Sequence, residues 1–368
     1  MIPQADPKAG YLAHKAEIDA AVAKALASGW YILGEEVKGF EAEFARFVGV
    51  GHGIGVANGT DALEIALRGL GVGPGDKVAT VSHTAVATVA AIELVGAAPV
   101  LLDVDSERYT MDADELAEVL TRETIKAVIP VHLYGQPAAI DRILQLCDAA
   151  KVPVIEDCSQ AHGAMLGNRQ VGAFGRVACY SLYPTKNLGA FGDGGIVVTD
   201  DADLAKRLRE IREYGWRDRY ISATTGMNTR LDELHAAMLR VRLRHLPADN
   251  ERRRAIAAIY DKELRHIGKP LVAPGVTHVY HQYVVRHRHR DGLRQRLKAM
   301  GVATNIHYPM PVHLQPAYAG RVQLGPKACQ ATEALASEIL SLPMFPELPD
   351  EQVRKVVQAI HSCIQLLH

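Results

Sequence analysis

The chain has 368 residues, 48% of them hydrophobic and 23% charged, which predicts a globular protein large enough for two domains. The 41 basic and 42 acidic side chains give a formal net charge of -1, so the charge balance gives no indication of nucleic-acid binding. The five cysteines are scattered without a C-x-x-C pair, which excludes a zinc ribbon or a disulfide framework and favours a reducing compartment.

The apolar segments predict a cytoplasmic protein that does not cross a membrane. The N-terminus has no apolar signal core, and the most apolar stretch, residues 84–102, is interrupted by Glu93, Gly96 and Pro99. A membrane-spanning helix needs about 20 consecutive apolar residues, so this stretch instead predicts a buried helix followed by a strand.

Helices are predicted over residues 12–28 and 36–48, and from there strands and helices alternate. The predicted strands are 54–57, 77–82, 100–102, 127–131 and 152–155, and the helices between them are 61–70, 85–95, 112–120 and 137–150. Such alternation predicts a mostly parallel sheet covered by helices on both faces. Ligands of these sheets bind beyond the carboxyl ends of the strands, so motifs at those ends are site candidates.

The second half of the chain changes character. Strands are predicted at 177–182, 196–199 and 282–285, and helices at 201–213, 231–264 and 291–300, followed by a segment rich in proline and histidine. We therefore predict an α/β protein with a large domain at 1–250 and a smaller C-terminal α+β domain at 251–368, joined by the long helix. The basic stretch 251–254 is interpreted as a solvated face of that helix.

Lys186 is the first candidate for catalysis. It follows a short apolar run and lies in the sequence Tyr-Pro-Thr-Lys-Asn-Leu-Gly at 183–189, with Gly192, Gly194 and Gly195 close behind. A lysine enclosed in such a setting loses hydration, which lowers its pKa and makes the amine a nucleophile. Pyridoxal phosphate is the commonest carbonyl cofactor of such a lysine. A surface lysine beside flexible glycines is the alternative interpretation of this motif alone.

Asp157 is the second candidate, because it follows the apolar run 152–155 and so lies at the carboxyl end of a predicted strand. A carboxylate in that place can pair with a protonated pyridine nitrogen and keep the ring an electron sink. A helix N-cap or a buried hydrogen-bonding acid would also fit the position. The glycine-rich interval between Asp157 and Lys186 favours the functional interpretation.

A phosphate site is predicted at Gly59-Thr60-Asp61, which opens a helix directly after a strand. Free N–H groups and the helix dipole favour an anion there. Ser181 lies just before Lys186 and would add a hydroxyl to the same phosphate. Simple helix capping by Thr60 or Asp61 is the alternative.

No metal site is predicted among the histidines, although the chain has 16 of them. The pairs His278 with His281 and His287 with His289 have spacings that suggest metal ligands. No acidic third ligand lies near either pair, so we interpret them as residues without a metal.

Several ordered motifs resemble one family. The segments 156–164, 183–189, 192–195 and 226–234 together resemble the sugar aminotransferases of the DegT/DnrJ/EryC1/StrS family. The resemblance extends from about residue 29 to residue 346, which is nearly the whole chain. It implies an α/β enzyme of fold type I that uses pyridoxal phosphate and works as a homodimer with active sites at the subunit interface.

The resemblance also implies roles for single residues. Lys186 would form the Schiff base with the cofactor and then move a proton between cofactor and substrate carbons, and Asp157 would hold the pyridinium. The other implied cofactor contacts are Gln160 at the phenolic oxygen, Gly59, Thr60, Asp61 and Ser181 at the phosphate, and Asn228 from the partner subunit. The implied substrate contacts are His162, Tyr183, His307, Tyr308 and His313.

One position departs from the family pattern. Many members have an aromatic side chain at the position of Ala85, where it stacks on the cofactor ring, and alanine cannot stack. His83 is a candidate to fill that space. A branch of the family has histidine in place of the lysine and removes a hydroxyl group instead, and Lys186 argues against that chemistry.

The expected reaction transfers an amino group from L-glutamate to a nucleotide-linked keto-sugar. The segments 81–84, 134–136 and 307–313 are most similar to enzymes that act on dTDP-linked 3-keto-6-deoxyhexoses. A 4-keto sugar and a UDP-linked 3-keto sugar are alternatives. A sugar dehydratase that uses pyridoxal phosphate and a non-catalytic nucleotide-sugar binding protein are the two readings from other functional classes.

Overall fold

The computed structural model describes residues 1–366 of the chain. The elements of the first half are α1 (Pro7–Ala13), α2 (Lys15–Ala27), α3 (Glu35–Val48), β1 (His52–Val56), α4 (Gly59–Gly69), β2 (Lys77–Val81), α5 (Val86–Leu94), β3 (Ala98–Leu102), α6 (Ala113–Arg122), β4 (Ala127–Val128), η1 (Leu133–Gly135), α7 (Ile140–Ala150), β5 (Ile155–Asp157), β6 (Met165–Leu166), β7 (Arg169–Gln170) and β8 (Val177–Ser181). Those of the second half are β9 (Gly195–Thr199), α8 (Ala202–Arg212), β10 (Trp216–Asp218), β11 (Ile221–Ser222), α9 (Glu233–Glu263), β12 (Val276–Thr277), β13 (Tyr283–Arg286), α10 (Arg290–Ala299), η2 (Val312–Leu314), β14 (Gln323–Leu324), α11 (Gln330–Glu338), β15 (Ile339–Leu342) and α12 (Asp350–Gln365).

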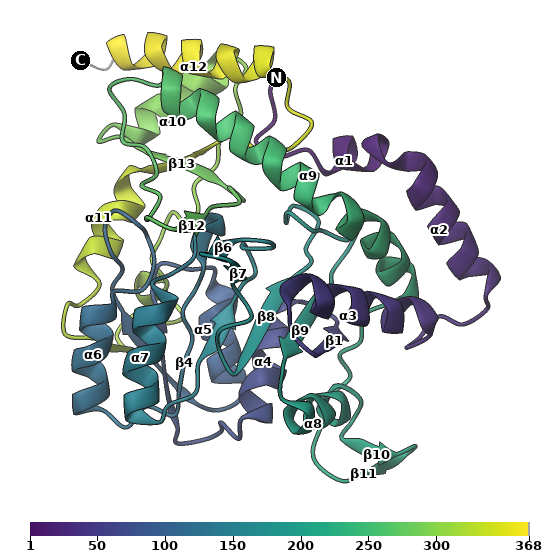
Figure 1. The fold of residues 1–368 in the computed structure, drawn as a ribbon. Coiled ribbons are helices and arrows are strands. Elements are labelled where there is room, and N and C mark those ends of the chain that lie inside the picture. The colour runs from purple at the N-terminus through teal and green to yellow at the C-terminus, as the bar shows by residue number, and fades with distance from the viewer. Residues whose placement is uncertain (367–368) are drawn as a thin grey trace.

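The centre of the fold is a sheet in two halves. One half has the strand order β1-β9-β8-β5 and the other β14-β3-β2-β4 (Figure 1). Parallel bridges from Val128 to Val154 and from Val131 to Asp157 join the halves. Strand β9 runs antiparallel to both β1 and β8, whereas β5 and β8 and all pairs of the second half are parallel. The predicted α/β architecture with a mostly parallel sheet is confirmed, with β9 as the reversed strand.

Helices cover both faces of this sheet. Because side chains alternate along a strand, one strand contributes side chains to the apolar cores on both faces. Val177 and Cys179 of β8 pack into the apolar cluster beneath α4 and α8. Ala178 and Tyr180 of the same strand point the other way, into the cluster beneath α3 and α9. Strand β8 is therefore buried on both sides, and only its carboxyl end opens toward solvent.

The C-terminal part returns to the main sheet. The predicted division at residue 250 falls inside α9, and β14 pairs in parallel with β3. One apolar cluster contains Val100 and Ile143 together with Tyr283, Leu340 and Ile360. The two predicted domains therefore share a core, and the placing of a boundary between them stays a prediction.

The basic stretch in α9 is not a solvated face, so that interpretation is wrong. Arg253 is 5% exposed and donates to the carbonyl oxygens of Met344 (3.1 Å) and Tyr280 (3.3 Å). Arg252 donates to the carbonyl oxygen of Leu348. Arg252 and Arg253 thus satisfy carbonyl oxygens of loop residues that pack against α9.

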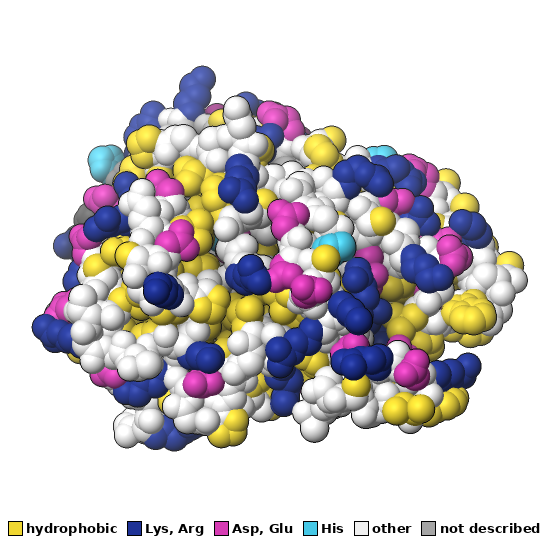
Figure 2. Space-filling view, turned by 60° about the horizontal axis from the view of Figure 1, so that its bottom comes forward, with side chains coloured by type: hydrophobic (Ala, Val, Ile, Leu, Met, Phe, Trp, Pro, Cys, Tyr) yellow, Lys and Arg dark blue, Asp and Glu magenta, His cyan; other side chains and the backbone are white. Residues whose placement is uncertain are grey.

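The surface carries charges of both signs. Figure 2 shows acidic and basic side chains interspersed over one face, with hydrophobic side chains exposed between them. Among residues 1–366, no helix is both long and apolar enough to cross a membrane.

Candidate active site

A cavity of about 440 Å³ opens at the carboxyl ends of β5 and β8. The first turn of α4, the start of α5 and the turn that carries Lys186 form its walls. The sequence-predicted residues that line it are Gly59, Thr60, Asp61, Asp157, Gln160, Ser181, Tyr183 and Lys186. The chain thus brings these side chains together from segments more than 100 residues apart in sequence.

The N-terminus of α4 presents unpaired N–H groups to this cavity. Asn58 caps the helix, because its side-chain oxygen accepts from the N–H of Asp61 (2.9 Å) and its carbonyl accepts from Ala62 (3.1 Å). Within residues 1–366 the N–H groups of Gly59 and Thr60 have no such partner. The capping role predicted as an alternative for Thr60 or Asp61 therefore belongs to Asn58.

Glycine is required at residue 59 by a close approach. A Cβ atom there would lie 2.7 Å from the Cβ of Ser181, at the end of β8. The absence of a side chain lets the helix start touch the strand end, so that the two free N–H groups and the Ser181 hydroxyl line one wall. Such a wall fits an anion.

A backbone hydrogen bond holds Lys186 in place, whereas its side-chain amine has no hydrogen-bond partner among residues 1–366. Its N–H donates to the carbonyl of Tyr183 (2.9 Å), which closes a tight turn after β8. Burial lowers the pKa of its amine to about 8, and the nearby Asp157 carboxylate opposes this shift only in part. A larger fraction of this amine than of an exposed lysine amine is therefore unprotonated near neutral pH, which favours a role as nucleophile or general base.

Asp157 ends β5 and is 4% exposed. One carboxylate oxygen accepts from the hydroxyl of Thr88 (2.9 Å) and the other from the N–H of Ser159 (3.1 Å). The hydroxyl of Thr88 also lies 2.9 Å from that of Thr84, one turn earlier in the chain. These contacts fix the direction of the carboxylate and leave lone pairs for a ligand.

Thr84, Thr88, Ser159 and Asp193 line the cavity but were missed by sequence reasoning. The spacing of four residues between Thr84 and Thr88, at the start of a predicted helix after a strand, is the signal that would have indicated them. Ser159 lies two residues after Asp157, where a short N–H contact to a carboxylate is common.

Glu156 supports this arrangement from the opposite face of β5. It is fully buried, and its oxygens accept from the N–H groups of Gly172, Phe174 and Gly175 and from Nε2 of His132 (3.0 Å). Burial alone would raise the pKa of this carboxyl, but these hydrogen bonds hold it below its ordinary value. Glu156, the neighbour of Asp157 in sequence, therefore fixes the loop that precedes β8.

Gln160 connects the cavity to the segment after residue 304. Its oxygen accepts from the N–H of Tyr134 (2.7 Å), and its amide donates to the hydroxyl of Tyr308 (3.1 Å). The Tyr134 hydroxyl in turn contacts the carbonyl of His307. The predicted substrate-side residues His307 and Tyr308 thus lie behind Gln160 and do not line the cavity itself.

His83 does not fill the space that Ala85 leaves, so this expectation needs correction. The His83 ring is 2% exposed, and its Nε2 lies 2.9 Å from the hydroxyl of Tyr134. Burial lowers the pKa of this imidazole to about 4, although Asp103 opposes the shift. Ala85 lines the cavity, whereas the contact with Tyr134 holds the His83 ring outside it.

His162 and His313 are buried in protein contacts instead of facing the cavity. The His162 ring is 0% exposed and packs against Phe44 and Tyr180. The Nδ1 of His313 lies 2.7 Å from the hydroxyl of Ser82, and its Nε2 lies 3.1 Å from Glu333. In this conformation His313 anchors its loop to the end of β2.

Two further predictions concern residues away from this cavity. Asn228 is exposed and forms an isolated bridge with Glu213, outside the cavity of its own chain.

His278 accepts from the N–H of Tyr280 (2.8 Å), and Nδ1 of His281 lies 3.3 Å from Asn187. These two histidines therefore have protein partners.

Comparison with known proteins shows to which family the chain belongs. Residues 13–361 match the DegT/DnrJ/EryC1/StrS aminotransferase family. The chain belongs to this family. A dTDP-3-amino-3,4,6-trideoxy-alpha-D-glucose transaminase of Streptomyces venezuelae is 47% identical, with 98% of this chain and 96% of that protein covered.

Two more similarities cover nearly the full length. A UDP-N-acetyl-3-dehydro-alpha-D-glucosamine 3-aminotransferase of Acidithiobacillus ferrooxidans is 43% identical, with 99% of this chain and 98% of that protein covered. The crystal structure of S. venezuelae DesV in complex with a ketimine intermediate superposes with a TM-score of 0.94 at 46% identity and covers 98% of both chains. The predicted family and its fold are thereby confirmed.

Proposed function

We propose that the protein uses pyridoxal phosphate to transfer an amino group from L-glutamate to a nucleotide-linked keto-sugar. The observation that carries the proposal is the cavity in which an unpartnered lysine amine, an oriented carboxylate and a helix N-terminus face one another. Membership of an aminotransferase family gives the reaction class, and the named relatives act on nucleotide sugars.

The residues of the cavity fit pyridoxal phosphate. The free N–H groups of Gly59 and Thr60 and the hydroxyl of Ser181 suit its phosphate, and Asp157 suits a protonated ring nitrogen. The amine of Lys186 is the nucleophile that would attack the carbonyl carbon of the cofactor. When bound, the cofactor supplies a carbonyl that carries nitrogen and a ring that withdraws electrons from the substrate carbon.

The side chains that line the cavity would then have separate roles in the reaction. Lys186 moves a proton to and from carbon, because its amine exchanges protons near neutral pH. Asp157 keeps a positive charge on the ring nitrogen and so stabilises the charge that develops when the proton leaves. Gln160, which Tyr134 and Tyr308 hold in place, is positioned to donate or accept at the cavity wall.

We propose a dTDP-linked 3-keto-6-deoxyhexose as the amino acceptor. The S. venezuelae relative is named for a dTDP-linked 3-amino sugar, which supports this class. The A. ferrooxidans relative is named for a UDP-linked sugar that is aminated at the same ring position, so a UDP-linked 3-keto sugar is the second candidate.

The proposal includes a homodimer. Trp30, Tyr31, Tyr220 and Ile221 expose 50–71% of their surface on two neighbouring segments. Apolar side chains exposed in this way are typical of a protein–protein interface. Asn228 follows these segments in the chain and would reach the phosphate site of the partner subunit.

The test is a panel of keto-sugar nucleotides incubated with purified protein and L-glutamate and followed by mass spectrometry. We expect one nitrogen in the product and one 2-oxoglutarate per turnover, with dTDP-3-keto-6-deoxyhexose preferred. A product that has lost a hydroxyl without gaining nitrogen would identify a dehydratase. Tight sugar-nucleotide binding with no cofactor absorbance in the visible would indicate a binding protein.

Cofactor capture should depend on pH through Lys186. Below a pKa of about 8 the amine is protonated and cannot attack a carbonyl, and above it the amine is free. We therefore expect the rate at which apoprotein recaptures pyridoxal phosphate, followed by visible absorbance, to rise with pH and level off above about 8. The Lys186→Arg variant should show no such rise. A pH-independent rate in the unmodified protein would contradict the assignment.

A further inference from the structure

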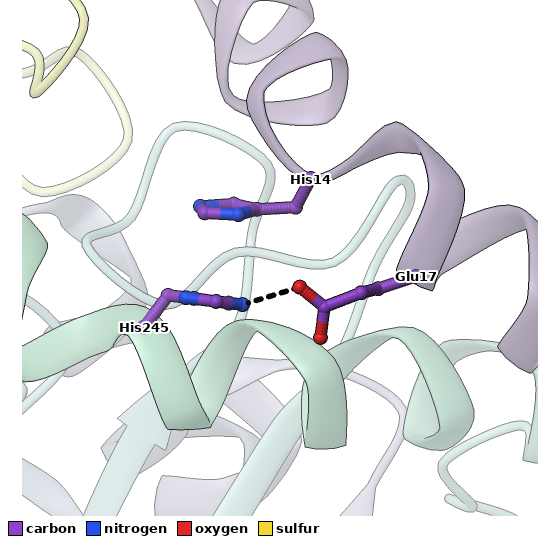
Figure 3. Close-up of side chains that lie close together, drawn as sticks. All are labelled: His14, Glu17 and His245. Carbon is purple, nitrogen blue, oxygen red and sulfur yellow. Dashed lines mark hydrogen bonds and ion pairs between the residues drawn. The ribbon is translucent and has the colours of Figure 1, made fainter.

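A second cluster of side chains, none of which lines the cavity, lies between the N-terminal arm α1–α2 and the long helix α9. It consists of His14, Glu17 and His245 (Figure 3). Candidate ligand atoms of the three residues all lie within 4.8 Å of one another. His14 and Glu17 are three residues apart at the start of α2, which directs both side chains toward α9.

We propose that His14, Glu17 and His245 form a binding site for a zinc-type divalent cation that ties the N-terminal arm to α9. Two imidazoles and one carboxylate are the protein ligands of many zinc sites that keep further positions for water. All three residues are partly exposed, so an ion can enter from solvent.

The carboxylate is already oriented. One oxygen of Glu17 lies 3.0 Å from Nε2 of His245, and the other accepts from Arg244 at 2.9 Å. Arg244 can keep its contact while the first oxygen binds an ion. A metal ligand whose second oxygen is held by a neighbouring donor has the outer support that tightens binding.

Binding requires one movement. The His14 ring lies over the His245 ring (Figure 3). The ring centroids are 3.8 Å apart and the interplanar angle is 12°, so the in-plane lone pairs of the two rings do not meet. No side chain among residues 1–366 hydrogen-bonds to the His14 ring, which is therefore free to turn toward Glu17.

The ion would add to an existing contact between the arm and α9. The arm packs on α9 through a satellite apolar cluster of Ile18, Met238 and Val241, separate from the main core. An ion bound by ligands from both segments stabilises the docked arm by mass action. The arm leads directly to residues 29–34, which precede α3.

The experiment is calorimetric titration of EDTA-treated holoprotein with ZnCl₂ in a buffer free of glutamate. We expect about one saturable site per chain, weakened by about 10-fold or more in His14→Ala and His245→Ala and also in Glu17→Gln, which preserves the size of the side chain. His289→Ala, at an exposed histidine outside the cluster, is the matched control and should bind zinc as the unmodified protein does.

A second readout reports on the arm. Limited proteolysis within residues 1–34 should slow when zinc is added to the unmodified protein and should not respond in His245→Ala. Equal zinc affinity in all variants, or weakening in His245→Ala without weakening in His14→Ala, would overturn the three-ligand site. The amino-transfer assay is independent of these results, so the inference and the proposed function can fail separately.

Discussion

The Lys186→Ala variant is expected to lose amino transfer by about 10²–10⁴-fold, the range that positioned general acid–base groups contribute. The amine of Lys186 has no protein partner within residues 1–366 and a pKa of about 8, and no other lysine lines the cavity. Removal of this side chain therefore removes the group that exchanges the proton. Single-turnover bleaching of the visible absorbance by L-glutamate is the direct measurement.

Two controls separate this role from simple loss of the cofactor. The N–H groups of Gly59 and Thr60 and the Asp157 carboxylate do not depend on Lys186, so Lys186→Ala should still retain pyridoxal phosphate on a desalting column. A small primary amine added to the solution can enter the space left by the side chain and should restore part of the rate. Lys186→Arg fills that space with a cation of much higher pKa and should not be rescued. Full turnover in Lys186→Ala would refute the assignment.

The convergence of Lys186 and Asp157 on one cavity could be predicted from the sequence because both residues follow regular strands. Lys186 comes just after β8, and Asp157 ends β5, so their convergence follows from the rule that sites lie at the carboxyl ends of parallel strands. The same rule placed Gly59 at the start of α4. The positions of these residues could be predicted from the local sequence pattern and one general property of α/β sheets.

Other features depend on contacts that no local pattern contains. Strands β6 and β7 have two residues each, and β14 joins the sheet beside β3, more than 200 residues earlier in the chain. The His83 ring was expected at the cavity, yet Tyr134, from a later loop, holds it in the interior. Arg253 was assigned to solvent because its neighbours are charged, whereas the carbonyls that it satisfies belong to distant segments. Tertiary packing decides each of these cases.

The substrate side was the least predictable part of the site. Tyr183 lines the cavity and is 51% exposed, whereas His313 is 5% exposed and bound to Ser82 and Glu333. A histidine in a proline-rich loop can either face a ligand or anchor the loop, and the choice depends on partners more than 200 residues away in the case of Ser82. Residue type alone carries no information about that choice.

The Asp157→Asn variant is expected to show the second large loss, of about 10²–10³-fold in turnover, comparable to the removal of one electrostatic contact to developing charge. Asparagine keeps the size of the side chain but has no negative charge to hold a proton on the ring nitrogen. Lys186 and the phosphate contacts at α4 are untouched, so the cofactor should remain bound with altered absorbance. The measurement is turnover together with a spectrum of the bound cofactor.

Thr88→Val is the matched control, because it keeps the Asp157 charge and removes the hydrogen bond of 2.9 Å that directs it, together with the contact between the Thr88 and Thr84 hydroxyls. The hydrogen bond to a charged group is worth about 1.5–3 kcal/mol, so a loss nearer to 10-fold is expected if it is only partly used in the reaction. A much larger loss in Asp157→Asn than in Thr88→Val would show that charge matters more than orientation. Equal losses in the two variants would show that the orientation of the carboxylate matters as much as its charge. Full activity in Asp157→Asn would show that the carboxylate has no part in the mechanism.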